Sequence, residues 1–577
     1  MTVLETTQRE RAASLEELRD AGRLVVSVGG HTICLLAENG TVHAIDNRCP
    51  HMGFPLHRGT VSDGILTCHW HHARFDLCTG GTFDQFADEL RRFPVEIEGD
   101  DVYVDVTPQR DPVEHQRQRL QVGLERNISL VVAKAAIVLI EADPSGVDAF
   151  RAGIDFGVRR RGGGWNRGLT TLTCFMNLLP RVTPDERAAA LYHGLTDVAL
   201  EAADDEPRFP LEPLPGEANP ERLARWFRNF IEVRDAEGAE RALVSAVRAG
   251  ATPPQLADML FTAATDHRYV DGGHTLDFVN KALEALDVAG WERAGAVLPS
   301  LAAPLAFAER MEEANAWRHP VDLVALLENA FERLPEPGAG PWEGRAELVE
   351  TILTAEAAEI LEALLAALLE GASAVELASA VTYAAAMRIA RFPTTNEFGD
   401  WDTALHTFTF ANAVEQGLRR SPSRALLRGV LDAAMSIHLD RFLNVPATRL
   451  PEPDDGHGVL TELPLLLDGQ QRVDDAAKLV ASYLGRGGDP DELIATLGAC
   501  LLREDRNFHT IQSVEAAVRQ HELLRGSEEA RLPLIAAARY LAAHAPTNRA
   551  QRQTYEIARR LHRGEKLYED ETLPPAA

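Results

Sequence analysis

The sequence has 577 residues, of which 45% are hydrophobic and 25% charged, and this composition excludes wholesale disorder and a collagen-like chain. At roughly 100–200 residues per domain, the length predicts about three to five structural units. The chain has 87 Asp and Glu against 58 Lys and Arg, a formal net charge of −29. Nucleic-acid affinity depends on cations that neutralise phosphates, so we expect no nucleic-acid partner.

No segment of the sequence is predicted to enter a membrane. The first twenty residues are charged and lack the apolar core of a secretory signal. The best apolar stretch, residues 128–140, is short and contains Lys134, so it predicts a buried helix. Six Cys in a chain of this length are no disulfide framework. We therefore expect a cytoplasmic protein without a membrane partner.

The N-terminal part of the chain is predicted to be a small all-β domain. Residues 1–21 are expected to form a helical segment, and residues 22–106 contain short runs of β-forming residues. Asn39 and Gly40 both accept the positive φ of a type I′ turn, so they predict a hairpin. Residues 95–104 are expected to form the closing hairpin of the domain.

After a linker at residues 107–112, the apolar spacing changes to three and four, which predicts an all-α domain over residues 113–577. Gly250, Gly371 and Gly487 occupy equivalent turns in an internal repeat. The repeat units are expected at about 127–215, 233–320, 352–450 and 470–549. One unit cannot bury its apolar face alone, so the units must stack into an array or close into a ring. Chance similarity among Ala- and Leu-rich helices is the alternative.

The sequence contains Cys49-x-His51 and, sixteen residues later, Cys68-x-x-His71, within the β region. This pattern resembles the Rieske [2Fe–2S] family. The resemblance implies a [2Fe–2S] cluster in which the two Cys hold one iron and the two His hold the other, which raises the reduction potential above that of an all-Cys cluster. A Cys2His2 zinc site uses the same ligand types and is the alternative, although the Cys-x-His spacing and the β context argue against it.

The resemblance is limited to the β domain and to one branch of the family. The high-potential respiratory proteins carry an extra Cys in each ligand loop, and residues 52–57 and 69–70 contain none. The domain therefore resembles the ferredoxin type, which serves oxygenases and reductases, and this implies an electron-donating reductase as partner. No Asp-x-x-His-x(4)-His run follows, so the chain does not resemble a Rieske oxygenase catalytic subunit beyond the β domain.

A second candidate site lies in the helical part. In three repeat units the third helix is expected to begin with a His-Thr pair, at His274, His406 and His509. A helix N-terminus disfavours imidazolium, so these rings are expected to stay neutral near pH 7. Three His with an open position would suit Fe(II) or another divalent metal. His193 and His267 are further candidates, and in the alternative each His only bonds a nearby backbone carbonyl.

Two functions from different classes follow. In the first, the protein is an oxygenase-like oxidoreductase whose helical domain receives electrons from the cluster and binds a small-molecule substrate, with an additional metal ion held by the repeated His. In the second, it is a non-catalytic ferredoxin-like electron carrier whose helical array docks a partner protein. A redox sensor is a third hypothesis. Iron beyond two atoms per chain would favour the enzyme.

Overall fold

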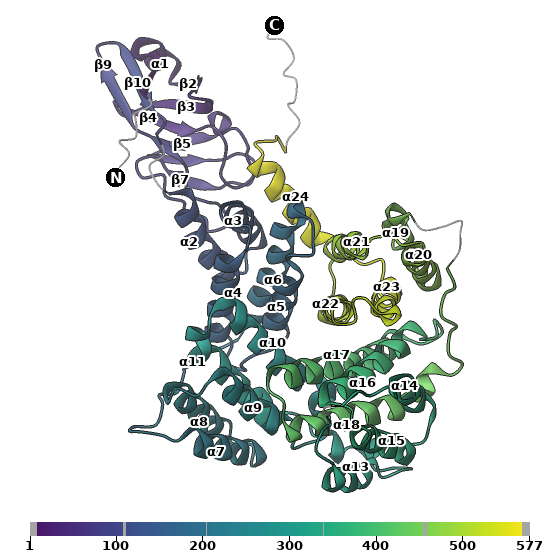
Figure 1. Ribbon diagram of the computed structural model, residues 1–577. Coiled ribbons are helices and arrows are strands. Elements are labelled where there is room, and N and C mark those ends of the chain that lie inside the picture. The colour runs from purple at the N-terminus through teal and green to yellow at the C-terminus, as the bar shows by residue number, and fades with distance from the viewer. Residues whose placement is uncertain (1–8, 108–110, 204, 339, 454–458, 568–577) are drawn as a thin grey trace. The chain divides into compact units, whose positions relative to one another are not determined.

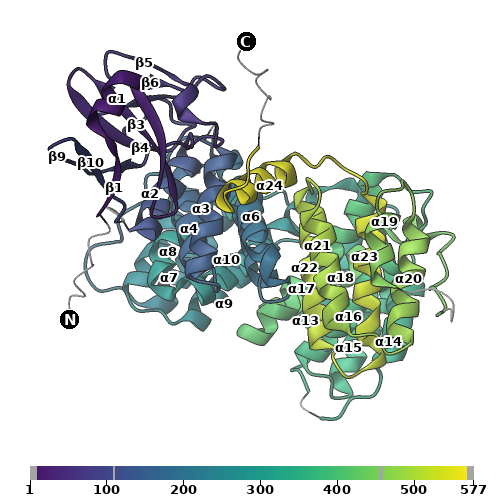
Figure 2. The same ribbon diagram turned by 90° about the horizontal axis from the view of Figure 1, so that it is seen from above.

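The computed structural model describes residues 9–107, 111–203, 205–338, 340–453 and 459–567 (Figures 1 and 2). Contacts divide the chain into two compact units, residues 1–142 with 553–577, and residues 143–552. The first unit holds the β domain and the second is helical, so the prediction of a multidomain chain with a small β domain before a large helical region is confirmed. No helix among the described residues is long and apolar enough to cross a membrane.

The β domain consists of three antiparallel sheets with the strand orders β1-β10-β9, β2-β3-β4-β8 and β5-β6-β7. The strands are β1 (Arg9–Ser14), β2 (Arg23–Val28), β3 (His31–Glu38), β4 (Thr41–Asp46), β5 (Thr60–Ser62), β6 (Ile65–Thr67), β7 (Arg74–Asp76), β8 (Arg92–Phe93), β9 (Val95–Glu98) and β10 (Asp101–Asp105). The predicted turn at Asn39 and Gly40 joins β3 to β4, with φ values of 48° and 78°. The predicted closing hairpin is β9 and β10.

The segment expected to be helical at residues 1–21 needs correction within its described part. Strand β1 pairs antiparallel with β10, and only Leu15–Ala21 forms a helix, α1. Ser14 ends the strand and caps this helix by accepting a hydrogen bond from the backbone N–H of Glu17. Sequence periodicity missed β1 because its partner strand lies some ninety residues later in the chain. The β domain thus begins at Arg9, ahead of the expected residue 22.

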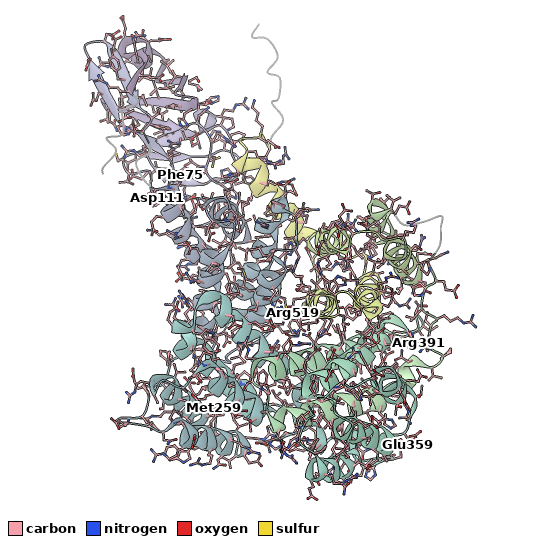
Figure 3. The ribbon with its side chains drawn as sticks, viewed as in Figure 1. Phe75, Asp111, Met259, Glu359, Arg391 and Arg519 are labelled. Atoms are coloured by element: carbon pink, nitrogen blue, oxygen red, sulfur yellow. The ribbon has the colours of Figure 1, made fainter. Side chains whose placement is uncertain are left out.

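Both segments that carry the Cys-x-His and Cys-x-x-His pattern rest on one apolar core. Cys49 and Cys68 are buried in a cluster that includes Leu66, Phe75 and Leu77. Phe75, on strand β7, is labelled in Figure 3. The core fixes the backbone on either side of the two ligand loops, which join β4 to β5 and β6 to β7.

Two helices that follow the β domain belong to the same compact unit, so the unit extends past the expected linker at 107–112. They are α2 (Pro112–Glu125) and α3 (Ser129–Ala142), and α24 (Ala550–His562) ends in this unit as well. Asp111, labelled in Figure 3, caps α2 by accepting from the N–H groups of its first turn. His115 and Arg119 on α2 lie 3.1 and 3.0 Å from the Asp88 carboxylate of the β domain.

The second unit is helical. Its helices are α4 (Val147–Arg160), α5 (Arg167–Leu178), α6 (Arg187–Ala202), α7 (Pro220–Glu232), α8 (Ala236–Arg248), α9 (Pro253–Ala264), α10 (His274–Ala289), α11 (Ala294–Val297), α12 (Ala302–Phe307), α13 (Leu323–Arg333), α14 (Arg345–Thr354), α15 (Ala357–Leu369), α16 (Ala374–Ala390), α17 (Phe398–Arg420), α18 (Arg424–Leu439), α19 (Leu463–Leu466), α20 (Val473–Gly485), α21 (Pro490–Leu502), α22 (Phe508–Leu523) and α23 (Arg531–Ala543).

Local features of the predicted repeat recur in the structure. Gly250, Gly371 and Gly487 follow α8, α15 and α20, and all three have positive φ, which only Gly adopts without strain. The helix that comes third in each copy is α5, α10, α17 or α22, and these pack in a closed order: α5 on α10, α10 on α17, α17 on α22, and α22 on α5. The repeat itself stays a prediction, and this packing favours a ring over an open array.

The centre of this four-helix ring is polar. Lys281 on α10 donates to Glu284 at 2.9 Å and to Glu515 on α22 at 2.6 Å. Asn177 on α5 donates to the same two carboxylates, at 2.7 and 2.8 Å. The side chains of Lys281 and Glu515 are only 2% exposed, so each buried charge needs the opposite charge beside it to offset the cost of desolvation. Arg519, labelled in Figure 3, lies on α22 and adds a second cation near them.

Candidate metal centres

The first candidate centre is formed by the two loops of the β domain. The Cys49 loop is closed by backbone hydrogen bonds from Cys49 N to Phe54 O (2.8 Å) and from Gly53 N to Cys49 O (2.7 Å). In the other loop, Cys68 N donates to Ala73 O at 2.9 Å, where β6 and β7 separate. Each loop is a tight turn with one residue at positive φ, Gly53 or His72, so both present their side chains on a fixed backbone.

The two thiols lie side by side and their titration is coupled. The hydrogen bond between them lowers the pKa of Cys68 to about 6 and raises that of Cys49. Burial raises both, while backbone N–H groups of the following residues in each loop point at the sulfurs and lower both. The arrangement therefore favours thiolate, the form that binds a metal, at Cys68, whereas the pKa of Cys49 is raised.

The imidazoles of His51 and His71 lie next to each other, edge to face. The ring centroids of His51 and His71 lie 4.9 Å apart. The Nδ1 atom of His51 is buried and has no hydrogen-bond partner. Burial, followed by the nearby His71 and Lys134 charges, lowers the pKa of His51 to about 4, so the ring is neutral at pH 7. A buried nitrogen without a partner, next to two thiols and a second imidazole, fits the donor set of a Rieske cluster.

Residues outside the strands hold the first ligand loop in place. The Lys134 ammonium on α3 donates to the carbonyl oxygens of Pro50 and His51, each at 2.7 Å. Burial lowers the pKa of Lys134 to about 8, so it is a cation at pH 7. Arg48, the residue before Cys49, donates to Leu561 O at the end of α24 at 3.3 Å.

The second candidate centre is formed by His274, His406 and His509. Among the His, Cys, Asp and Glu residues of the described ranges, these three form the one group placed to hold a single metal ion. Their ligand atoms all lie within 4.8 Å of one another. The Nε2 atoms of His406 and His509 are 3.0 Å apart, and those of His509 and His274 are 3.5 Å apart. A metal about 2.0–2.1 Å from each nitrogen requires them roughly 3 Å apart, so the spacing fits one ion.

The electrostatics of this centre favour neutral rings. Burial, and then the charge of neighbouring imidazoles, lowers the pKa of His274 to about 3 and that of His406 to about 4. The His274 ring stacks on that of His509, meets that of His406 edge to face and packs at a tilt against Phe508, and all three His are partly buried. A neutral imidazole is the form that ligates a metal. The prediction of neutral rings agrees with these pKa directions for His274 and His406, for which burial is the main cause.

Asp402 orients one of the three rings. Its carboxylate lies 3.4 Å from Nδ1 of His509, on the side of the ring opposite Nε2. Burial alone would raise the pKa of Asp402, but hydrogen bonds from His509, His544 and Tyr540 hold it well below its usual value. A carboxylate on the far nitrogen is the common way in which proteins fix the tautomer of a metal-binding His.

The structure confirms the predicted helix positions for only two of the three His. His274 and His509 lie in the first turns of α10 and α22 as predicted, but the prediction is wrong for His406, which lies inside α17. That helix begins earlier, at Phe398, because Glu397 and Asp400 form a capping box.

His193 and His267 are not in the group. His193 is buried on α6, and His267 lies between the carboxylates of Glu312 and Glu232, at 2.6 and 2.8 Å. Burial lowers the pKa of His193 to about 4, and its ring packs against the neighbouring Tyr192. Both ring nitrogens of His267 therefore have partners, whereas the buried Nε2 of His193 has no hydrogen-bond partner.

Sequence reasoning missed the residues that support the two centres. In the sequence, Lys134 is only a charged residue within an apolar stretch, and Tyr540 belongs to no motif. Asp402 lies one helical turn before His406 on the same helix, a spacing that could have suggested a shared face. Its partner, however, is His509 on another helix, which no local spacing reveals.

Comparisons with known proteins concern the β domain alone. The family model of the Rieske [2Fe-2S] domain matches residues 9–94. The ferredoxin component of the naphthalene 1,2-dioxygenase system of Pseudomonas aeruginosa is 31% identical over 97 residues, which are 17% of this chain and 93% of that protein. Human apoptosis-inducing factor 3 is 36% identical over 96 residues, and the chain spans only 16% of its length.

Among solved structures, the ferredoxin of carbazole 1,9a-dioxygenase from Nocardioides aromaticivorans is 25% identical. The match covers 17% of this chain and 97% of that one, with a TM-score of 0.16. The family model ends at residue 94, so the role of the helical unit is argued from its own geometry.

Proposed function

The chain belongs to the Rieske [2Fe–2S] family through residues 9–94, and from this premise we propose that it is an oxidoreductase with two metal centres. The β domain accepts single electrons from a reductase and passes them to a metal ion held by His274, His406 and His509. Such an ion would supply the site at which dioxygen, as the terminal oxidant, takes up two electrons from the reductase and two from a small-molecule substrate. Fusing donor and acceptor in one chain keeps them at high effective concentration.

The ligands proposed for the cluster are Cys49 and Cys68 on one iron and His51 and His71 on the other. When bound, such a cluster carries one electron at a time at a potential above that of an all-Cys cluster. The support is the partnerless Nδ1 of His51 next to the paired thiols. The backbone N–H groups aimed at the sulfurs stabilise thiolate, and the similarity to ferredoxin components supports electron transfer.

The single observation that carries the second centre is the convergence of three Nε2 atoms from three helices. Three imidazole ligands leave at least one coordination position for a substrate or water. Zinc has no redox chemistry, so an acceptor of single electrons must be a redox-active ion, and imidazole ligands suit iron. We propose Fe(II) as the resident ion.

The surrounding residues have distinct tasks. Asp402 accepts from Nδ1 of His509 and keeps Nε2 free to bind the ion. Tyr540 donates to the same carboxylate and stacks on His544, which fixes the carboxylate in place. The partial burial of the three rings limits the access of bulk water, which strengthens electrostatic interactions at the ion.

Metal analysis of the anaerobically purified full chain tests this proposal. We expect three irons and two acid-labile sulfides per chain. In a triple variant with His274, His406 and His509 changed to Ala, iron should fall to two while the cluster spectrum persists. Two irons in the wild-type chain would instead favour the electron carrier that docks a partner protein.

A further inference from the structure

Lys134 places a cation on the cluster loop from outside the matched domain. It lies on α3, beyond residues 9–94, on a stretch where the neighbours from Val131 to Leu139 are all apolar. It is one of four lysines among 58 basic side chains in this Arg-rich sequence. A lysine offers a compact point charge on a flexible stem, and Lys134 has Ala on either side of it in the helix.

The ammonium is directed at the ligand loop and not at a carboxylate. Its Nζ lies 2.7 Å from Pro50 O and 2.7 Å from His51 O, the two carbonyls that directly follow Cys49. No ion pair of Lys134 is found within the residues that the structure describes, and the nearby Asp88 is already paired with Arg119 and His115. The charge of Lys134 is therefore available to the centre that the loop forms.

We propose that Lys134 is a positioning residue that fixes the Cys49–His51 loop and raises the reduction potential of the cluster. Reduction adds one electron, supplied by the reductase, and no proton or other group. The net charge of the cluster falls by one, so a fixed cation nearby stabilises the reduced form more than the oxidised form. Two hydrogen bonds to the loop keep that cation at a constant distance.

This inference rests on the cluster ligation proposed above and is independent of the second metal. The proposed ligation and the proposed role of Lys134 can be contradicted separately. A wild-type chain without a [2Fe–2S] spectrum would contradict the ligation, whereas the effect of Lys134 is measured only in chains that carry a full cluster.

The test is a spectroelectrochemical titration of the cluster in the full-length chain, after iron and sulfide have been counted. Lys134→Met removes the charge at nearly constant volume, Lys134→Gln keeps a donor without the charge, and Lys134→Arg keeps the charge. Lys478→Met is the matched control, because it makes the same change at an exposed lysine of the other unit.

We expect Lys134→Met to disfavour reduction at least tenfold, which is about 59 mV for a one-electron couple. Lys134→Gln should show a decrease in the same direction, and Lys134→Arg and Lys478→Met should stay close to the wild type. An unchanged potential in Met and Gln variants that carry full clusters would overturn the proposal. So would failure of all three Lys134 variants to assemble a cluster, which would assign the residue a purely structural role.

Discussion

The two candidate centres are built in opposite ways. The proposed cluster ligands come in two short loops, each containing one Cys and one His within four residues, on one small domain. The three converging His come from α10, α17 and α22; His406 is 132 positions after His274, and His509 is 103 positions after His406. The first centre has a fixed spacing that identifies it, and the second exists only once the helices have packed.

This difference predicts where each centre is vulnerable. The loops depend on strands that pair over short distances, such as β6 with β7, and on a local apolar core. The His group depends on the relative placement of whole helices, and hence on the polar side chains at the centre of the ring. Variants that act on one centre should therefore leave the other unchanged.

The largest effect is expected from the ligands themselves. Replacing His406 with Ala removes one of three ligands, so the second iron and substrate oxidation should both be lost. The cluster spectrum and its potential should not change, because no cluster ligand is touched. Iron counting checks the loss of the second iron, and electron paramagnetic resonance on the same sample checks that the cluster is retained. Loss of the cluster signal would contradict the independence of the two centres.

The second-largest effect is expected from disrupting the polar centre of the four-helix ring. Lys281→Met leaves the carboxylates of Glu284 and Glu515 buried without their cation, which typically costs about 3–5 kcal/mol. Chemical unfolding followed by circular dichroism should show the loss in the helical unit. Arg333→Met removes a cation from an exposed pair with Glu362 and should leave the transition where it is. Equal effects of the two variants would count against the ring.

A smaller effect is expected at Asp402, which touches the ion only through His509. Asp402→Asn keeps the shape of the side chain and removes its charge, so it should lower the affinity for the second metal roughly 10–100-fold. A competition titration with a chelator measures this affinity. Asp400→Asn, two residues earlier at the start of α17, is the matched control. Unchanged affinity in Asp402→Asn would rule out the orienting role.

The smallest effect concerns pH. In the metal-free chain the pKa values of His274 and His406 are about 3 and 4, below the value of about 6.5 in an unfolded chain. The unfolded state binds protons first, so the stability contributed by these neutral rings is complete above pH 6.5 and is lost as the pH falls towards 4. Unfolding of the wild type and of His274→Gln/His406→Gln, compared across this range, isolates the contribution. Parallel pH profiles would contradict it.

The sequence was informative wherever the signal is local. The turn at Asn39 and Gly40, the hairpin of β9 and β10, and the family of the domain all followed from short-range patterns. Strand β1 was not predicted because it is defined by pairing with β10, and neighbouring residues carry no trace of that pairing. The extent of the first unit was missed for the same reason, because α2 and α3 join it through contacts with distant loops.

The same distinction between local patterns and long-range contacts applies to the two candidate sites. The loop pattern pointed to Cys49 and its partners, whereas the repeat placed His274, His406 and His509 in equivalent positions without showing that they meet. Their convergence requires the ring of α5, α10, α17 and α22, and a repeat alone is equally compatible with an open array. Lys134 and Asp402 act across contacts between segments far apart in the chain, so no periodicity could single them out.

The central claim is that an electron on the cluster reaches the metal held by the three His. A chain with both centres oxidised, given one electron per molecule and freeze-quenched over time, tests it directly by electron paramagnetic resonance. We predict that the signal of the reduced cluster appears first and then decays as the ferric signal of the second centre falls, and that it persists in His509→Ala. A cluster signal that persists in the wild type with both metals present would contradict the account.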